Sequence, residues 1–172
     1  MTSYSRPVLR LVTAPEGGGE ADDWTWFCGH CAAPAQSDGP PAPGSRVCGT
    51  CGLGLLLEAR REAVPSSRQA FLVVDTALRV QALSSAGENL LRVREQAAVD
   101  RPLREFLVPA DAEGPHQPLE DVIANAFSSQ GQPCWAQVRP SNTFGVRMRA
   151  RIASCGPPRA ALIVLGAVRP VD

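Results

Sequence analysis

Two pairs of cysteines are the residues of this 172-residue chain best suited to chemistry. Each pair has two residues between its cysteines, sixteen residues separate the pairs, and the four are Cys28, Cys31, Cys48 and Cys51. This spacing is typical of a four-thiolate zinc site, in which two short turns direct their sulfurs at one tetrahedral ion. Four thiolates fill the coordination sphere of zinc, so no position stays open for catalysis. We therefore predict one structural Zn²⁺ per chain, held by these cysteines.

The residues on either side of the cysteine pairs predict the short strands that would position them. Residues 24–27 alternate as a strand would, and leucines recur at alternate positions over residues 53–57. The glycine after the first cysteine of each pair, Gly29 or Gly49, is expected to permit the tight turn. With these features residues 24–57 resemble a zinc ribbon, a unit so short that it usually needs a metal or disulfides to fold.

Two other interpretations of the cysteine pairs are less favoured. A C-x-x-C pair can be a thiol redox centre, but one such centre needs one pair rather than two matched pairs. Disulfides are disfavoured in a reducing compartment. The chain shows no apolar N-terminal signal segment, and its longest apolar run, residues 160–165, is far too short to cross a membrane. We therefore expect a cytoplasmic protein. Separately, we expect His30, which lies between the first two cysteines, to be solvated.

The charge balance excludes some classes of function. The chain carries 17 basic and 17 acidic residues, and every basic residue is an arginine. A neutral chain lacks the broad positive field of a protein that coats nucleic acid or binds a membrane surface. With 44% hydrophobic residues it can bury a core, which excludes wholesale disorder. Residues 1–23, where three successive glycines precede an acidic stretch, are expected to be flexible.

The second half of the chain predicts an α+β domain. Residues 70–74 and 78–83 have the pattern of two strands, and Ser85 with Glu88 is a capping box for a short helix. A longer helix with one apolar face follows Pro118. Three further strands follow a Gly-Gln-Pro break, and the middle one alternates apolar residues with arginines. This order of elements predicts an antiparallel sheet with helices grouped on one side.

That order, together with four stretches of sequence, resembles a PAS domain over residues 70–168. The stretches are residues 71–75 in the first strand and its turn, 100–103 and 106–111 in the middle turns, and 131–133 after the long helix. The resemblance implies a five-stranded antiparallel sheet with helices on one face, preceded here by the small zinc ribbon. Residues 58–69 would then form a linker or a short helix.

The resemblance also implies that a small ligand could lie between the sheet and the helices, and it leaves the identity of that ligand unknown. A haem would need an axial ligand such as His116, which precedes the long helix. Cys134, at the start of a strand, is a second candidate for contact with a cofactor, although a buried free thiol acts as a small apolar group. Residues 101–108 contain no cysteine, which argues against flavin photochemistry.

Arg147, Arg149 and Arg151 point to one face of the middle strand, opposite an apolar face that we expect to include Phe144. This row is either a solvated face of the sheet or a docking surface for an acidic partner segment or a second subunit. Nucleic acid is the less favoured partner, because the chain is neutral and has no lysine.

The sequence therefore predicts a non-enzymatic regulatory or signalling protein, with a zinc ribbon and a PAS-like domain that binds a partner protein or a small ligand. It contains only two histidines, no phosphate-binding glycine loop and no recognisable nucleophile and base arrangement. One alternative is a nucleic-acid-binding transcriptional regulator whose PAS-like domain makes a homodimer. The other is a thiol switch that releases zinc on oxidation.

Overall fold

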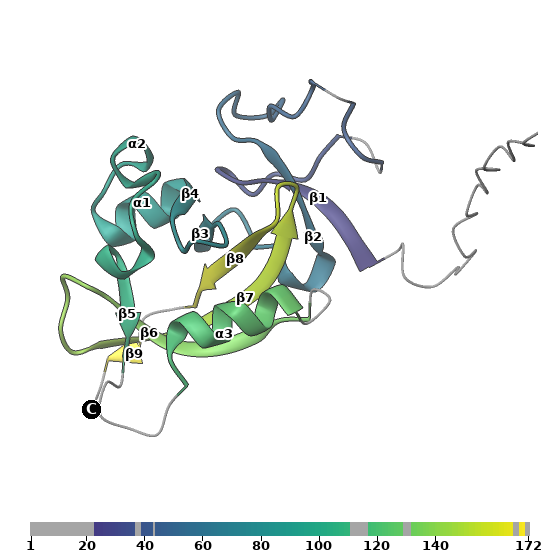
Figure 1. Ribbon diagram of the computed structural model, residues 1–172. Helices are drawn as coiled ribbons and strands as arrows, with labels where there is room; N and C mark the ends of the chain where they lie inside the picture. The colour runs from purple at the N-terminus through teal and green to yellow at the C-terminus, as the bar shows by residue number, and fades with distance from the viewer. Residues whose placement is uncertain are drawn as a thin grey trace, which may run out of the picture.

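Strands dominate the fold, which we describe from a computed structural model for residues 23–36, 39–42, 44–110, 117–128, 132–166 and 169–170 (Figure 1). The strands are β1 (Trp24–Cys28), β2 (Leu56–Arg60), β3 (Ala70–Val74), β4 (Val80–Leu83), β5 (Leu107–Pro109), β6 (Cys134–Pro140), β7 (Val146–Gly156), β8 (Ala160–Leu165) and β9 (Arg169–Pro170). The helices are α1 (Ser85–Leu91), α2 (Glu95–Ala98) and α3 (Leu119–Ser128), and the 3₁₀ turns are η2 (Arg61–Ala63) and η3 (Leu103–Glu105).

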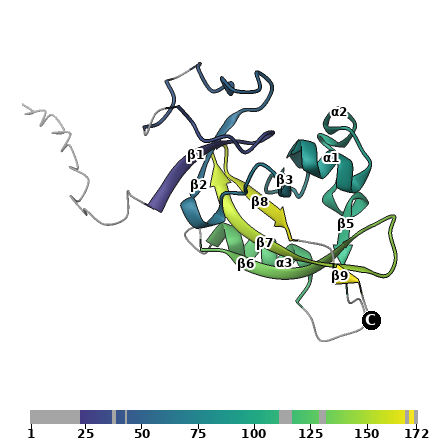
Figure 2. The ribbon, with the colours of Figure 1, turned by 180° about the vertical axis from the view of Figure 1, so that it is seen from behind.

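The five strands expected of the PAS-like domain are present and pair antiparallel in the order β6-β7-β8-β3-β4. The sheet is larger than the five strands that we predicted. β1 and β2 form an antiparallel hairpin, and β2 pairs with the end of β7 through Glu58 opposite Gly156 and Ala59 opposite Cys155 (Figure 2). β5 also pairs with β6, and β9 pairs with β7. The cysteine-bearing segment is therefore continuous with the sheet of the second domain.

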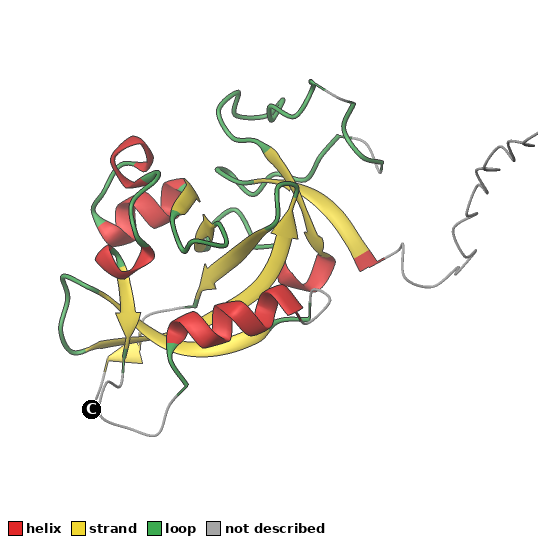
Figure 3. Cartoon of the chain, in the orientation of Figure 1, coloured by secondary structure: helices red, strands yellow, loops and turns green. Residues whose placement is uncertain are grey.

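The helices cover one face of this sheet, as the sequence predicted (Figure 3). α3 packs on β6, β7 and β8, α1 packs on β3, and α2 packs on β4. The apolar stripe of α3 is buried, and Ile123 is fully enclosed. Beneath the helices, residues such as Leu72, Met148 and Ile163 fill the space with apolar side chains. This inner core occupies the region between sheet and helices.

A second apolar layer lies on the opposite face of the sheet, where the β1–β2 hairpin covers it. Side chains alternate along a strand, so Phe71 and Val73 face away from the inner core that Leu72 and Val74 enter. Phe71 and Val73 pack with residues of β8 and with three hairpin residues, which are Phe27, Leu57 and Ala59. All six residues of β8 are buried for this reason. The continuous apolar run predicted such a strand, covered on both faces.

Several predicted boundaries were wrong, each for a local reason. Residues 58–60 extend β2 instead of beginning a helix, and only η2 turns before Pro65. β4 begins at Val80 because Leu78, with φ of 58°, lies in the preceding turn. The cap of α1 is Ser84, whose hydroxyl oxygen accepts from Gly87 N, and not Ser85. Phe144 lies in the turn before β7 with 82% of its side chain exposed, so it does not continue the buried face.

Candidate metal centre

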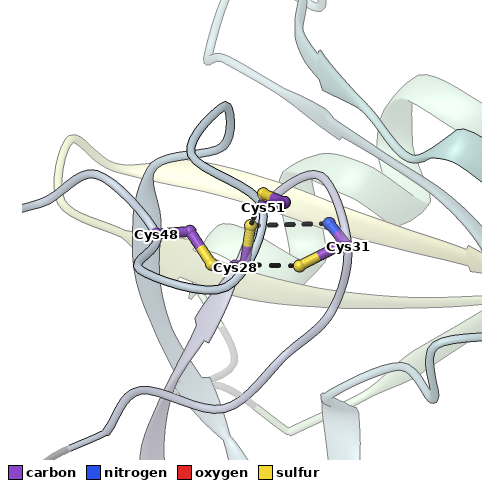
Figure 4. A group of neighbouring side chains, drawn as sticks. All are labelled: Cys28, Cys31, Cys48 and Cys51. Carbon is purple, nitrogen blue, oxygen red and sulfur yellow. Dashed lines mark hydrogen bonds between the residues drawn. The ribbon is translucent and has the colours of Figure 1, made fainter.

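The four predicted cysteines come together in two loops at the end of the β1–β2 hairpin (Figure 4). Cys28 ends β1 and Cys31 follows it in a turn, whereas Cys48 and Cys51 lie in a second turn before β2. Their sulfur atoms all lie within 4.8 Å of one another. Cys28 Sγ is 3.6 Å from Cys51 Sγ, and Cys31 Sγ is 3.9 Å from Cys48 Sγ.

These separations fit four ligands of one ion. A tetrahedral ion with metal–sulfur bonds of about 2.3 Å, the value for zinc thiolates, places its sulfurs about 3.8 Å apart. A disulfide needs about 2.05 Å, so the two close pairs are not cross-links. Thiolates are soft ligands, which suit zinc or another thiophilic ion better than magnesium or calcium. The four cysteines could therefore bind a single metal ion.

The two cysteine turns have the same backbone geometry. In the first, Ala32 N donates to Cys28 O at 3.0 Å, and in the second, Gly52 N donates to Cys48 O at 2.9 Å. Both donors have positive φ, 60° for Ala32 and 68° for Gly52. The left-handed residue thus follows the second cysteine of each pair. Our expectation that the tight turn depends on the glycine after the first cysteine was wrong.

Backbone amides point at the sulfurs and favour their ionised form. Cys28 Sγ accepts from His30 N and Cys31 N at 3.3 and 3.4 Å, and Cys48 Sγ accepts from Thr50 N at 3.4 Å. Burial still raises the pKa of the Cys28 thiol above its usual value. For Cys48, burial acts in the same direction, but amide donors of its own turn and neighbouring thiols outweigh it and lower the pKa to about 6. A bound cation would stabilise all four thiolates.

The candidate metal centre is fixed to the sheet by Arg46. Its guanidinium donates to Leu56 O at 3.0 Å and also to Pro157 O in the β7–β8 turn. The same group lies 5.9 Å from the ring centroid of Trp26, a residue of β1. Trp26 and Leu56 pack against Cys28 and Cys48. One arginine thus connects the metal centre, the hairpin and the PAS-like sheet.

His30 provides a second connection, to the helices. Its Nε2 lies 3.1 Å from Ser85 Oγ, and its Nδ1 lies 3.2 Å from Glu95 Oε2. The side chain is only 12% exposed, so the prediction of a solvated residue was wrong. A groove of about 640 Å³ runs along this junction. Its lining residues are His30, Leu53, Ser85, Glu88, Asn89, Arg94, Glu95 and Gln96.

The candidates for cofactor contact lie apart from this centre. His116 is outside the described residues. Cys134 is half-buried at the start of β6, where it packs against the inner core. Cys155 is buried in the second apolar layer, and burial raises the pKa of its thiol to about 12. A thiol in that position stays protonated and inert.

The three arginines of β7 differ in their surroundings. Arg151 donates to Ala63 O and Val64 O, both at 3.3 Å, so it fastens η2 to the sheet. Arg149 places its guanidinium 3.9 Å from the ring centroid of Trp135, and Arg147 is exposed. Sequence reasoning did not single out Trp135. Its alternation with Cys134 and Ala136 was a signal that its ring faces outward with the arginines.

A comparison with protein families agrees with this architecture. The family model described as PAS fold matches residues 64–163. The PAS domain of nitrogen regulation protein NR(II) from Vibrio parahaemolyticus is 17% identical, with a TM-score of 0.42, over 60% of this chain and 89% of that one. A PAS domain from Desulfitobacterium hafniense is 12% identical, with a TM-score of 0.42, over 60% and 93%. A chain of the E. coli DhaR(N)–DhaL complex is 15% identical, with a TM-score of 0.39. The match covers 58% of this chain and 32% of that one. No curated protein matches.

Within the described residues, no helix is long and apolar enough to cross a membrane.

Proposed function

Since this chain belongs to the PAS family, we propose that it is a non-enzymatic regulatory protein that acts by binding a partner protein or a small ligand. PAS membership supports a sensory or regulatory role in signalling. The observation that carries the proposal is the pairing of β2 with β7, which joins a cysteine centre to the PAS sheet. A structural change in the cysteine centre would therefore alter the PAS sheet, and a change in the sheet would alter the cysteine centre.

The cysteine centre binds one structural Zn²⁺ in this proposal. Four sulfur ligands suit a closed tetrahedral site, and such a site stabilises a fold without reacting with substrate. The contacts of Arg46 and His30 then transmit the stability of the metal-bound loops to the sheet and to α1 and α2. The described cysteines form no disulfide, and reduced cysteines persist in a reducing compartment, so the proposal includes a cytoplasmic location.

Metal analysis of freshly reduced protein tests the zinc assignment. We expect about one zinc per chain, lost when Cys28 or Cys51 is changed to Ser. Cys134→Ser is the matched control, because Cys134 lies outside the cluster and its variant should keep the metal. Less than half an equivalent of metal in the wild-type protein would overturn the assignment.

Purification from the native cells tests the regulatory role. We expect the tagged chain to retain one dominant protein in stoichiometric amount, or a small ligand detected by native mass spectrometry. The Cys28→Ser variant should lose that component, because the metal centre supports the PAS sheet. A chain that carries neither component, or one that turns over a substrate, would contradict the proposal.

A further inference from the structure

The charges of this neutral chain are strongly segregated. Between Asp121 and Asp172 the sequence contains six arginines and no acidic residue. This stretch includes β6, β7 and β8, so a large part of the sheet carries only positive charge. The compensating acidic residues lie earlier in the chain, many of them on or beside the helices, as at Glu88, Glu95 and Glu120.

Three of these arginines gather on the outer face of β6 and β7 together with two exposed aromatic rings. Arg149 stacks on Trp135, whose side chain is 48% exposed. Arg139 lies 5.0 Å from the ring centroid of Phe144, and Arg147 is exposed beside them on β7. Gln137, also exposed, is paired with Arg149 across the strands. We call Trp135, Gln137, Arg139, Arg147 and Arg149 the arginine–tryptophan face.

This face lies outside both apolar layers. α3 covers the inner side of β6 and β7 (Figure 1), and the β1–β2 hairpin covers the outer side of β3 and β8. Among the described residues, no carboxylate forms an ion pair with Arg139 or Arg149. Arg151, in contrast, is half-buried and donates to two backbone carbonyls, so it is not included in this face. Within the described parts of the chain, Arg139 and Arg149 therefore offer positive charge that no carboxylate neutralises, beside the exposed ring of Trp135.

We propose that the arginine–tryptophan face docks an acidic segment of a partner protein. The proposal rests on the binding role given above and names the surface and the partner chemistry. Guanidinium groups bind carboxylates through paired hydrogen bonds, and Arg149 is held in place by its contact with Trp135. Tryptophan and arginine are also the residues that most often dominate the energy of protein interfaces.

Two other occupants fit this face less well. A symmetric dimer would place the same patch against itself, so arginine would meet arginine with no acidic residue between Asp121 and Asp172 to compensate. Nucleic acid would need a wider positive field, whereas the whole chain is neutral. An acidic peptide needs only the local charge and the apolar anchor that the face provides.

Selection from a displayed library of random peptides tests the proposal on the full, metal-loaded chain. Peptides are selected on the wild-type protein, with no depletion on a variant. We expect enriched peptides to be rich in Asp and Glu with one or two apolar residues. The best peptide is then labelled, and its Kd is measured by fluorescence anisotropy. Arg149→Glu and Trp135→Ala should each raise the Kd by about tenfold or more.

Arg92→Glu is the matched control, since Arg92 is exposed at the end of α1 and its variant makes the same change in net charge. It should leave the Kd within about twofold. Equal losses in Arg92→Glu and Arg149→Glu would overturn the proposal, because total charge alone would then explain binding. The proposal would also be overturned if a single-stranded oligonucleotide bound more tightly than the best peptide. It would be overturned too if the selected peptides were not enriched in Asp and Glu. Peptides or a native partner that bind regardless of Arg149 would overturn this surface while leaving the regulatory role intact.

Discussion

Gly54 packs tightly against the candidate metal centre. It lies just before β2, and its N–H points at Cys51 Sγ at 3.5 Å. A Cβ at this position would overlap Cys28 Sγ and would lie 2.7 Å from the Cβ of His30. The requirement is for space rather than for an unusual backbone angle, because no positive φ occurs at Gly54.

Replacing Gly54 with Ala should therefore weaken metal binding. The added methyl group displaces Cys28 Sγ from the other three sulfurs, and metal sites tolerate only small errors in ligand position. We expect at least a tenfold loss in the affinity for zinc, measured by competition with a chromophoric chelator. Gly39→Ala is the control, since a Cβ there meets nothing within 4 Å. Equal affinities for zinc in the Gly54→Ala and Gly39→Ala variants would contradict the close contact between Gly54 and Cys28 Sγ.

The grouping of the four cysteines was predictable from sequence, but its surroundings were not. A short C-x-x-C spacing encodes a local turn, so the cysteines could be grouped without knowledge of the fold. The need for space at Gly54 and the contacts of His30 with Ser85 and Glu95 depend on segments far apart in the chain. No local pattern reports which distant segment will lie against a given side chain.

At the scale of elements, the β1–β2 hairpin acts as a cover for the sheet as well as a support for the cysteines. Phe27 points away from the sulfurs and packs edge-on against Phe71 of β3, with ring centroids 6.2 Å apart at 66°. Its side chain is fully buried. The alternation of residues 24–27 predicted the strand, but the strand periodicity alone could not say that a second sheet face was its target.

Phe27→Ala should destabilise the whole protein, because it leaves a cavity between the hairpin and β3. Loss of a fully buried phenylalanine costs about 3–5 kcal/mol, whereas a change at an exposed site is usually within about 0.5 kcal/mol. Phe144→Ala is the matched control, since Phe144 is the exposed phenylalanine of the described chain. Urea unfolding followed by circular dichroism measures both. A cost below about 1 kcal/mol for Phe27→Ala would mean that the hairpin packs only loosely on the sheet.

At the scale of the whole molecule, the hairpin changes what a PAS domain exposes. The succession of the five strands along the chain could be predicted, because turn residues and the amphipathic α3 mark each element. The pairing of β2 with β7 could not, since it links residues about a hundred positions apart and involves only two residue pairs. The sequence did contain one indication that the outer face of the sheet is covered. β8 is uniformly apolar, and its burial on both faces requires a second covering layer.

A shortened chain of residues 64–172 tests whether that cover is needed. It keeps the five PAS strands and the three helices but uncovers the outer side chains Phe71, Val73, Leu162 and Val164. Leaving such side chains exposed forgoes about 1.5–3 kcal/mol each, so the fragment should unfold at a lower urea concentration. It should also bind a hydrophobic dye and self-associate, because a contiguous apolar patch seeks another surface.

Size-exclusion chromatography with light scattering, together with dye fluorescence, would measure both effects. The same fragment with Phe71→Ser and Leu162→Ser is the control, since it removes apolar area from the exposed face while leaving the inner core unchanged. That control should return to a monomer with low dye binding, although its stability stays low. A fragment that is monomeric and as stable as the full chain would show that hairpin and PAS domain fold independently.

Removing the metal from the full chain should also expose the apolar side chains of the outer face, but to a smaller extent than in the fragment. β2 stays attached to β7 in the metal-free chain, while the cysteine loops lose their order.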